Sequence, residues 1–522
     1  MSATLPEHLA ALLLPSAYPH PVAEVTLVET HISWVLLTGE VAYKIKRPVR
    51  FPFLDLGSLE RRALFCKEEL RLNRRFAPQL YRDVCPIVLV DGMARVDVPG
   101  EPIEYAVKMF QFSRDDELDN LLAHRRIAPA ELAAFGRELA AIHGRLPVAA
   151  PPEPWGEPRS VHDNIIRNLE ECVCAAAVFD GTSAVRSLRL QVEESLKCLI
   201  PWMSDRREGG RVRECHGDLH AANVVRLESR LVAFDCLEFE PAFRWIDVAD
   251  ELAFLLADLD ARGYPQHEQA FLSGYLHHSG DYQACRLLPL YKAHHALVRA
   301  KVGALALRSA GAGTSSAGAD DSRLLAFRAY LDCAARSLSL KSPALILMSG
   351  LSGSGKTWLA ERLAPLLGAV HLRSDIERKR LAGVDDSAHT GSALGEGVYS
   401  KHFTARVYAY LVTAVEDILS GGYVAVVDAT FSRREDRDAF RKLASRLGVP
   451  ARMIHCHASH EVVRSRIQER DRQGRDASEA DVNVLEWQKE HWEAVVSDER
   501  WTVLRVDTAD VDVAELTRAL IE

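Results

Sequence analysis

The sequence predicts a two-domain protein of mixed α/β and α+β class, on three observations. In residues 1–341 a group of strands precedes a group of helices, an order typical of α+β domains. In residues 342–522 strands and helices alternate, which indicates a parallel sheet with helices on both faces. A glycine-rich loop that ends in Lys-Thr follows the first strand of this second stretch. We therefore expect one domain over 1–341 and a second over 342–522.

Composition indicates an ordinary globular chain. Of 522 residues, 48% are hydrophobic and 26% charged, and the net charge of −9 does not favour a broad nucleic-acid-binding surface. No apolar run approaches 18 residues, so we expect no membrane span. The ten cysteines are scattered without a C-x-x-C pair, which predicts reduced thiols and a cytoplasmic location. The oligomeric state is left open.

The expected elements of the first domain begin with strands and end with helices. β-rich segments alternate with turns early in the chain, and apolar residues at helical spacing dominate later. A stretch of small residues, 309–320, predicts a mobile loop. The predicted strands are 25–28, 32–37, 41–46, 84–90 and 103–110, and the predicted helices are 58–76, 129–204 with a proline-rich break at 147–158, 246–307 and 322–338.

The second domain shows regular strand–helix alternation. Four short apolar runs and five longer amphipathic segments follow one another. The predicted strands are 344–348, 369–372, 423–427 and 451–456, and the predicted helices are 356–367, 403–420, 435–447, 460–470 and 479–496.

A constellation for phosphoryl transfer is spread over the first domain. The spacing H-x-D-x-x-x-x-N places Asp218 and Asn223 on one short loop, a carboxylate near an acceptor hydroxyl and an amide oxygen near a metal. Twelve residues on, the apolar run 232–234 ends in Asp235, which is placed to bind Mg²⁺. Upstream, Val-Ala-Tyr-Lys ends in Lys44, a candidate for contact with ATP phosphates, and Glu68 or Glu69 on the next helix would pair with it.

These motifs resemble the aminoglycoside phosphotransferase-type branch of the protein-kinase-like fold, over about residues 20–335. The resemblance implies a two-lobed domain in which Asp218 is the catalytic base, Asn223 and Asp235 bind Mg²⁺, and Lys44 is the ATP lysine. Lys46 is a rival for that last role, because alternate strand residues share a face.

The same resemblance implies two further features. A hinge whose backbone meets adenine would lie near 104–109, and Asp247 and Asp250 would brace the catalytic loop. No G-x-G-x-x-G motif precedes Lys44, and this branch commonly lacks it. A kinase-like fold that has lost its activity is the alternative.

The loop of the second domain is a phosphate-binding loop of the form G-x-x-x-x-G-K-[ST] in its required strand–loop–helix setting. Its glycines allow backbone N–H groups to converge on phosphate oxygens, its lysine reaches the β- and γ-phosphates, and its threonine hydroxyl holds Mg²⁺. A linker would need neither Lys-Thr nor the flanking strand and helix. The candidate nucleotide-binding residues are Gly350, Ser352, Gly353, Ser354, Gly355, Lys356 and Thr357.

Residues 344–522 resemble the gluconate-kinase, zeta-toxin and polynucleotide-kinase-like group of P-loop, AAA-type kinases. In an S-D-x-x-R element of that group, Asp375 would take the acceptor's proton and Arg378 would steady substrate or phosphate; alternatively Ser374 or Asp375 caps a helix. Asp428 ends an apolar strand and resembles a carboxylate that binds metal or orients substrate.

Arginines follow in two groups. Arg433, Arg434 and Arg437 either contact an anionic substrate or line an exposed helix face. Arg466 and Arg470, one helical turn apart, resemble lid arginines, and Arg470 is the better candidate to reach the γ-phosphate; a solvated charged face is the alternative.

The order of the two domains resembles an uncharacterised bacterial family in which both kinase types are fused. The resemblance implies a bifunctional phosphotransferase that uses ATP and Mg²⁺ and takes small-molecule hydroxyl acceptors. Three alternatives remain: one catalytic P-loop kinase with a regulatory or substrate-sensing domain, a toxin-like or nucleic-acid-end kinase, and a non-enzymatic ATP-binding switch.

Overall fold

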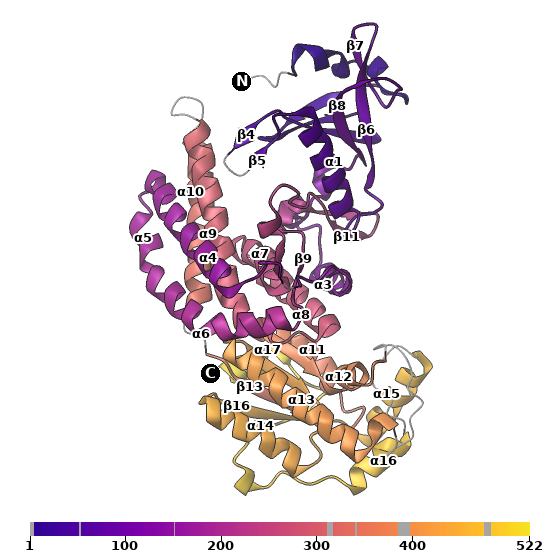
Figure 1. Ribbon diagram of the computed structural model, residues 1–522. Helices are drawn as coiled ribbons and strands as arrows, with labels where there is room; N and C mark the ends of the chain where they lie inside the picture. The colour runs from indigo at the N-terminus through magenta and orange to yellow at the C-terminus, as the bar shows by residue number, and fades with distance from the viewer. Residues whose placement is uncertain are drawn as a thin grey trace. The chain divides into compact units, whose positions relative to one another are not determined.

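A computed structural model describes residues 5–51, 54–150, 152–310, 317–339, 342–384, 397–473 and 482–521. The chain packs into two compact units (Figure 1). Unit 1 comprises Met1–Glu131, Ala141–Ile166 and Ile200–Asp258, and unit 2 comprises Leu132–Ala140, Arg167–Leu199 and Leu259–Glu522. The expected combination of α+β and α/β architecture is confirmed.

Unit 1 is built on a six-stranded antiparallel sheet. The strand order is β1-β2-β3-β8-β6-β7, and helix α1 (Leu59–Asn73) packs on β6 and β8. Figure 1 shows α1 against this indigo sheet. The strands are β1 (Thr26–Glu29), β2 (Ser33–Leu37), β3 (Val41–Lys46), β6 (Tyr81–Val90), β7 (Met93–Val96) and β8 (Pro102–Phe110), with a separate small hairpin of β4 (Arg50–Phe51) and β5 (Leu54–Asp55).

Alternation along β3 sends two sets of side chains to opposite faces of this sheet. Tyr43 and Ile45 join a core that is closed on its other side by the short 3-10 helix Glu7–Leu13, through buried Leu9 and Leu12. Lys44 and Lys46 therefore lie on the opposite face, toward α1. The sheet thus positions both lysines while burying an apolar face behind them.

The rest of unit 1 brings short strands around the predicted catalytic loop. Strand β9 leads into it and β10 leaves it, and β9 pairs with β12 while β10 pairs with β11. Helix α7 follows β12. The elements are β9 (Val212–Glu214), β10 (Val224–Leu227), β11 (Arg230–Ala233), β12 (Trp245–Asp247), α2 (Leu118–Ala123) and α7 (Val248–Ala261).

Unit 2 contains a five-stranded parallel sheet in the order β14-β15-β13-β16-β17. All its strand pairs are parallel, so the carboxyl ends of the strands meet at one edge. The strands are β13 (Leu345–Ser349), β14 (Ala369–Arg373), β15 (Val424–Asp428), β16 (Ala451–His457) and β17 (Thr502–Asp507). The predicted parallel sheet is confirmed, with one strand more than expected.

Helices cover both faces of the parallel sheet, which explains why β13 and β15 are apolar at every position but the last. Ile346 and Met348 pack against α11 and α17 on one face, and α13 and α14 lie on the other. The helices of this part are α11 (Lys356–Leu367), α12 (Ser374–Leu381), α13 (Lys401–Ser420), α14 (Arg434–Leu447), α15 (His460–Gln473), α16 (Val482–Glu490) and α17 (Val513–Ile521).

Two helices that precede the parallel sheet in sequence also pack against it within unit 2. Helix α8 (Pro265–Ser279) contacts β14 and α11, and α9 (Ala284–Ala310) contacts α13. His277 Nε2 donates to the carbonyl of His371 at 2.6 Å, and Arg286 pairs with Asp417 at 2.5 Å. Gly421 approaches the backbone of Cys285 so closely that a Cβ there would lie 2.1 Å from its carbonyl oxygen.

The remaining helices lie between the early strands and this sheet in sequence. They are α3 (Pro129–His143), α4 (Pro158–Ala175), α5 (Thr182–Ser187), α6 (Arg189–Glu208) and α10 (Ala317–Leu338). Of the predicted loop 309–320, residues 311–316 lie outside the described residues, and α9 and α10 reach Ala310 and Ala317. No helix in the described parts of the chain is long and apolar enough to cross a membrane.

Two local expectations are wrong, and two elements were not expected. Residues 104–109 do not form a hinge, because they lie inside β8, whose backbone pairs with β3 and β6. The strand ends at Phe110, so the connection between sheet and helices begins after it. The helix expected over 479–496 ends at Glu490, and neither β17 nor α17 was predicted.

Candidate functional sites

The catalytic-loop motif of unit 1 is held in one conformation by the helix that follows it. Gly217 has φ = +85°, and a Cβ there would lie 2.7 Å from the Phe243 carbonyl, so glycine is required. The carboxylate of Glu251, on α7, accepts the backbone N–H groups of His216 at 2.7 Å and Gly217 at 3.0 Å. Glu251 therefore holds the loop amides, the role expected of Asp247 and Asp250, and Asp247 pairs with buried Arg206.

Asp218 and Asn223 lie together, as the motif predicts. Asn223 Nδ2 donates to the Asp218 backbone carbonyl at 2.9 Å and to its side-chain Oδ2 at 3.0 Å. The Asp218 side chain is 36% exposed, whereas Asn223 is buried. Asn223 thus orients the Asp218 carboxylate, which remains open to solvent, as a base for an incoming hydroxyl must be.

His216 links the catalytic loop to the end of β11. Its Nε2 donates to the Phe234 carbonyl at 2.8 Å, and its Nδ1 accepts the Asp218 backbone N–H at 3.3 Å. Burial lowers the pKa of His216 to about 4, against an opposing effect of the Asp218 charge. The imidazole is therefore neutral near pH 7 and fixes the loop next to Asp235.

A buried network of charges joins β3, α1 and the segment after β11. Lys44 Nζ lies 2.9 Å from Glu69 Oε1 and also contacts Asp235, while Lys46 contacts Glu69 and Glu238. Glu69 is therefore the helix partner, not Glu68, which pairs with Arg71 and Arg244. Burial alone would raise the pKa of Glu69, but the two lysines lower it to about 2.

The two lysines differ in what surrounds them. Lys46 is fully buried between two buried carboxylates, whereas Lys44 faces Asp235, whose side chain is 44% exposed. Asp235 also has φ = +64°, a strained value for a non-glycine residue and one that clusters at functional sites. The geometry favours Lys44 for ligand contact and gives Lys46 a structural position.

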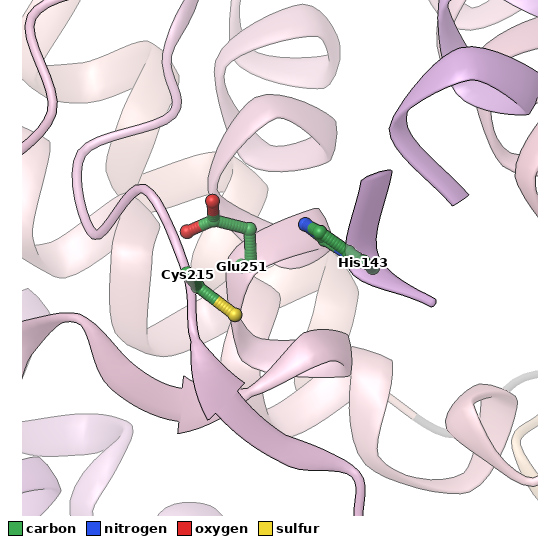
Figure 2. Close-up of side chains that lie close together, drawn as sticks. All are labelled: His143, Cys215 and Glu251. Atoms are coloured by element: carbon green, nitrogen blue, oxygen red, sulfur yellow. The ribbon is translucent and has the colours of Figure 1, made fainter. Parts of the chain in front are cut away.

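Behind the catalytic loop, His143, Cys215 and Glu251 bring three ligand-type atoms within 4.8 Å of one another (Figure 2). Both carboxylate oxygens of Glu251 already accept loop amides, and burial raises the pKa of the Cys215 thiol well above its ordinary value. We assign this cluster to packing beneath the loop.

The phosphate loop of unit 2 has the expected backbone. Gly350, Gly353 and Gly355 have φ of +144°, +79° and +86°, and added Cβ atoms would meet neighbouring atoms at under 3.0 Å at each. Lys356 Nζ donates to the carbonyls of Gly350 at 2.8 Å and Leu351 at 2.9 Å. The loop is therefore folded and its lysine is held by the loop's own carbonyls.

Asp428 lies beside this loop because β13 and β15 are parallel neighbours with Met348 opposite it. Thr357 Oγ1 donates to Asp428 Oδ2 at 2.6 Å. Burial opposes ionisation of Asp428, but His371, whose Nε2 lies 3.7 Å from Asp428 Oδ2, and the charge of Lys356 lower its pKa to about 2. A carboxylate next to the loop hydroxyl fits the donor set that Mg²⁺ prefers.

The other predicted residues of unit 2 divide into two groups. The charges of Asp375 and Arg470 both act on the Lys356 ammonium, whose pKa is lowered chiefly by burial, so both lie near the loop. Arg378 is instead buried and donates to the Val398 carbonyl at 2.7 Å and to Thr404 Oγ1 at 3.1 Å. It supports the segment before α13 in this structure.

Two alternatives from the sequence are wrong in part: a helix cap at Ser374 or Asp375, and an exposed helix face formed by the arginines of 433–437. Helix α12 begins at Ser374, and no side chain caps its N-terminus. Arg437 is fully buried and pairs with Glu499 at 2.7 Å, so it neither lines an exposed face nor reaches a ligand. Arg466 donates to Thr508 Oγ1 at 2.8 Å against the outer side of the loop, which leaves Arg470 as the better lid candidate.

Sequence comparison finds a family match in the part of the chain that contains the phosphate loop. A family model described as "AAA domain" matches residues 345–495. Uncharacterized proteins of Mycobacterium tuberculosis (strain ATCC 25618 / H37Rv) and Mycobacterium bovis are 28% identical over 94% of this chain and 94% of their own lengths. The relatives therefore match across both units, and their names state no activity.

Solved structures of kinases match each region separately. A gluconokinase from Sinorhizobium meliloti is 22% identical and covers 34% of this chain and 89% of its own, with a TM-score of 0.24. A choline/ethanolamine kinase family protein from Mesorhizobium loti is 12% identical and covers 60% of this chain and 91% of its own, with a TM-score of 0.35. The family match and the phosphate loop support a P-loop nucleotide-binding domain over residues 345–495.

Proposed function

We propose that the chain is a bifunctional ATP-dependent phosphotransferase. Each site transfers the γ-phosphate of Mg·ATP to a hydroxyl of a small molecule. Two sets of residues support this: Asp218, Asn223, Asp235 and Lys44 in unit 1, and Lys356, Thr357, Asp428, Asp375 and Arg470 in unit 2. The proposal assigns them to domains over 1–341 and 342–522 and places the enzyme in the cytoplasm.

In unit 1, the observation that carries the proposal is the Lys44–Glu69 pair next to the exposed Asp235. Glu69 holds the Lys44 ammonium at the opening of the site, where it binds phosphate oxygens. Asp235 and Asn223 would hold Mg²⁺, which when bound offsets the charge of the phosphates. Asp218 accepts the proton of the acceptor hydroxyl, and Asn223 keeps that carboxylate oriented.

In unit 2, the Thr357–Asp428 pair carries the proposal. The amides of the phosphate loop and Lys356 bind the β- and γ-phosphates, and Thr357 with Asp428 would hold Mg²⁺. Asp375 takes the proton from the second acceptor, and Arg470 stabilises the charge on the transferring phosphate. Alignment of donor and acceptor in one cleft supplies most of the rate acceleration in such reactions.

Separate inactivation of the two sites tests the proposal. Transfer from radiolabelled ATP is measured for wild type, Asp218→Asn and Lys356→Ala on sugars, nucleotide sugars and 5′-hydroxyl oligonucleotides. We expect each variant to lose transfer to a different small-molecule acceptor. Loss of all turnover in one variant and none in the other would show a single kinase with a regulatory domain. Labelling of the oligonucleotides alone would show a nucleic-acid-end kinase, and binding without turnover would show an ATP switch.

A further inference from the structure

The phosphate loop of unit 2 is supported from outside by two helices, α15 and α16. A Cβ on Gly353 would lie 2.9 Å from Ile467 Cγ1 and 3.0 Å from the Val463 carbonyl oxygen, so α15 touches the loop backbone directly. Leu351 of the loop packs against the small apolar cluster that Val463 and Ile467 form with Leu485 of α16. The loop's outer side is therefore covered by side chains from both helices.

Helix α16 also makes a two-point polar contact with the loop. The backbone N–H of Ser352 donates to Gln488 Oε1 at 2.9 Å, and Gln488 Nε2 donates to Ser352 Oγ at 3.1 Å. Gln488 is 8% exposed, and Leu485, one turn earlier, is the other buried residue among 484–490. A carboxamide fits here because it offers an acceptor and a donor on one planar group.

Both ends of one peptide group of the loop are engaged by side chains. The carbonyl of Leu351 accepts from Lys356 Nζ at 2.9 Å, and the N–H of the same peptide, that of Ser352, donates to Gln488. The Lys356 ammonium has three donors, and two of them bind loop carbonyls, so a phosphate oxygen draws on a lysine that also holds this peptide. Gln488, together with the Ser354 backbone N–H that donates to the Leu351 carbonyl at 3.1 Å, fixes the orientation of the Leu351–Ser352 peptide independently of Lys356.

We propose that Gln488 is a positioning residue of the nucleotide site, which keeps the Leu351–Ser352 peptide fixed when Lys356 turns to a phosphate oxygen. This inference rests on the proposed binding of ATP at the loop. It adds to the nucleotide site a residue more than 130 positions from the loop in sequence, which lies outside the phosphate-loop motif. It also makes α16 part of the support for the bound nucleotide.

The test uses the full-length protein and a fluorescent ATP analogue carrying an N-methylanthraniloyl group, titrated in Mg²⁺-containing buffer. Because unit 1 is also proposed to bind ATP, only the part of the binding that Lys356→Ala abolishes is assigned to the loop of unit 2, and the affinities below refer to that part. Gln488→Leu keeps the side chain's size and removes both hydrogen bonds, so we expect affinity to fall about tenfold, the cost of a buried unpaired N–H. Ser352→Ala removes only the hydroxyl partner and is expected to cost about two- to threefold. Glu490→Gln, on the exposed side of the same helix, is the matched control and should bind as wild type does.

Thermal unfolding without nucleotide, followed for every variant, separates positioning from simple packing. A Gln488→Leu protein that melts earlier but binds the analogue with wild-type affinity would overturn the inference. If Gln488→Leu does not fold, Gln488→Met decides, because it also removes both hydrogen bonds, and wild-type affinity in that variant would overturn the inference equally. Binding of the analogue that is the same in wild type and Lys356→Ala would instead refute the proposed ATP site of unit 2.

Discussion

The phenol of Tyr282 donates a 2.8 Å hydrogen bond to Oε1 of Glu377, and Arg380 pairs with the other oxygen of the same carboxylate at 2.8 Å. Tyr282 and Glu377 are both buried. The tyrosine belongs to the connection between α8 and α9, and the glutamate lies on α12, two residues after Asp375. The helix with the candidate base is thus held by a residue nearly a hundred positions upstream.

Removal of that hydroxyl is expected to loosen unit 2. Tyr282→Phe leaves Glu377 Oε1 without its short hydrogen bond in a buried place, and such losses cost about 1–3 kcal/mol. We expect a lower midpoint of thermal unfolding and a lower rate of transfer at the P-loop site. Transfer at the unit 1 site should be unchanged, and it serves as the internal control. An unchanged midpoint would show that the bond contributes nothing to stability.

Because Thr357 and Asp428 are proposed to hold Mg²⁺, replacement of Asp428 should weaken the dependence of ATP binding on Mg²⁺. Asp428→Asn removes the carboxylate charge beside Lys356 while keeping the side chain's size. Because hydrogen bonds and contacts that involve charged groups are worth about 1.5–3 kcal/mol, the gain in ATP affinity on adding Mg²⁺ should fall by about tenfold or more. Isothermal titration with and without Mg²⁺ measures this gain. Asp438→Asn, on α14, is the control and should keep the wild-type gain.

The two lysines of β3 should respond differently to the same substitution. Lys46→Met leaves Glu69 and Glu238 crowded together in a buried place, and breaking a buried pair in this way costs about 3–5 kcal/mol. Lys44→Met leaves Glu69 paired with Lys46 and Asp235 partly solvated, so its cost in stability should be smaller. Urea unfolding and unit 1 turnover, measured on both variants, should show a stability defect in Lys46→Met and chiefly an activity defect in Lys44→Met. The reverse pattern would assign the ligand-binding role to Lys46.

The buried imidazole of His143 predicts a pH-dependent difference in stability. Burial, and then the charges of Arg213 and Arg75, lower its pKa to about 3 from an ordinary value near 6.5. Between these values the unfolded chain binds a proton that the folded protein does not, so this contribution to stability is fully present above pH 6.5 and declines as the pH falls toward 3. The slope is about 1.4 kcal/mol per pH unit.

The difference between wild type and His143→Gln isolates this group from the other titrating residues. Urea midpoints at pH 7.5, 6.5 and 5.5 should show wild type losing stability relative to the variant as the pH falls. A difference that stays constant over this range would contradict the low pKa. A difference that grows in favour of wild type as the pH falls would contradict the direction of the pKa shift of His143.

Local sequence signals predicted a large part of the fold. The phosphate loop and α11 follow from glycine spacing, a Lys-Thr pair and helical periodicity, and α11 has the predicted bounds 356–367. Strand β3 and helix α1 follow from alternation and an apolar stripe. In each case the signal lies in fewer than about 20 consecutive residues, the range over which periodicity is informative.

What the sequence left undecided depends on contacts between distant residues. Alternation places Lys44 and Lys46 on one face, but only the packing of α1 and of residues 235–238 shows which lysine is enclosed. Strand β17 has one buried position, Val506, and its pairing with β16 decides its existence. Glu251 and Gln488 belong to no motif, and only their hydrogen bonds to loop amides reveal them.

The close packing of α8 and α9 on β14, α12 and α13 limits how the gene could be recombined. Consider a chimaera joined near residue 342, with the first part from this chain and the second from a mycobacterial relative. Tyr282 of this chain would then face the relative's residue in place of Glu377. Any side chain larger than glycine at the position of Gly421 would collide with the Cys285 carbonyl. An exchange in which residues 265–310 move together with the parallel sheet keeps these contacts matched. Chimaeras of the second kind should therefore survive selection for a folded product far more often than those of the first.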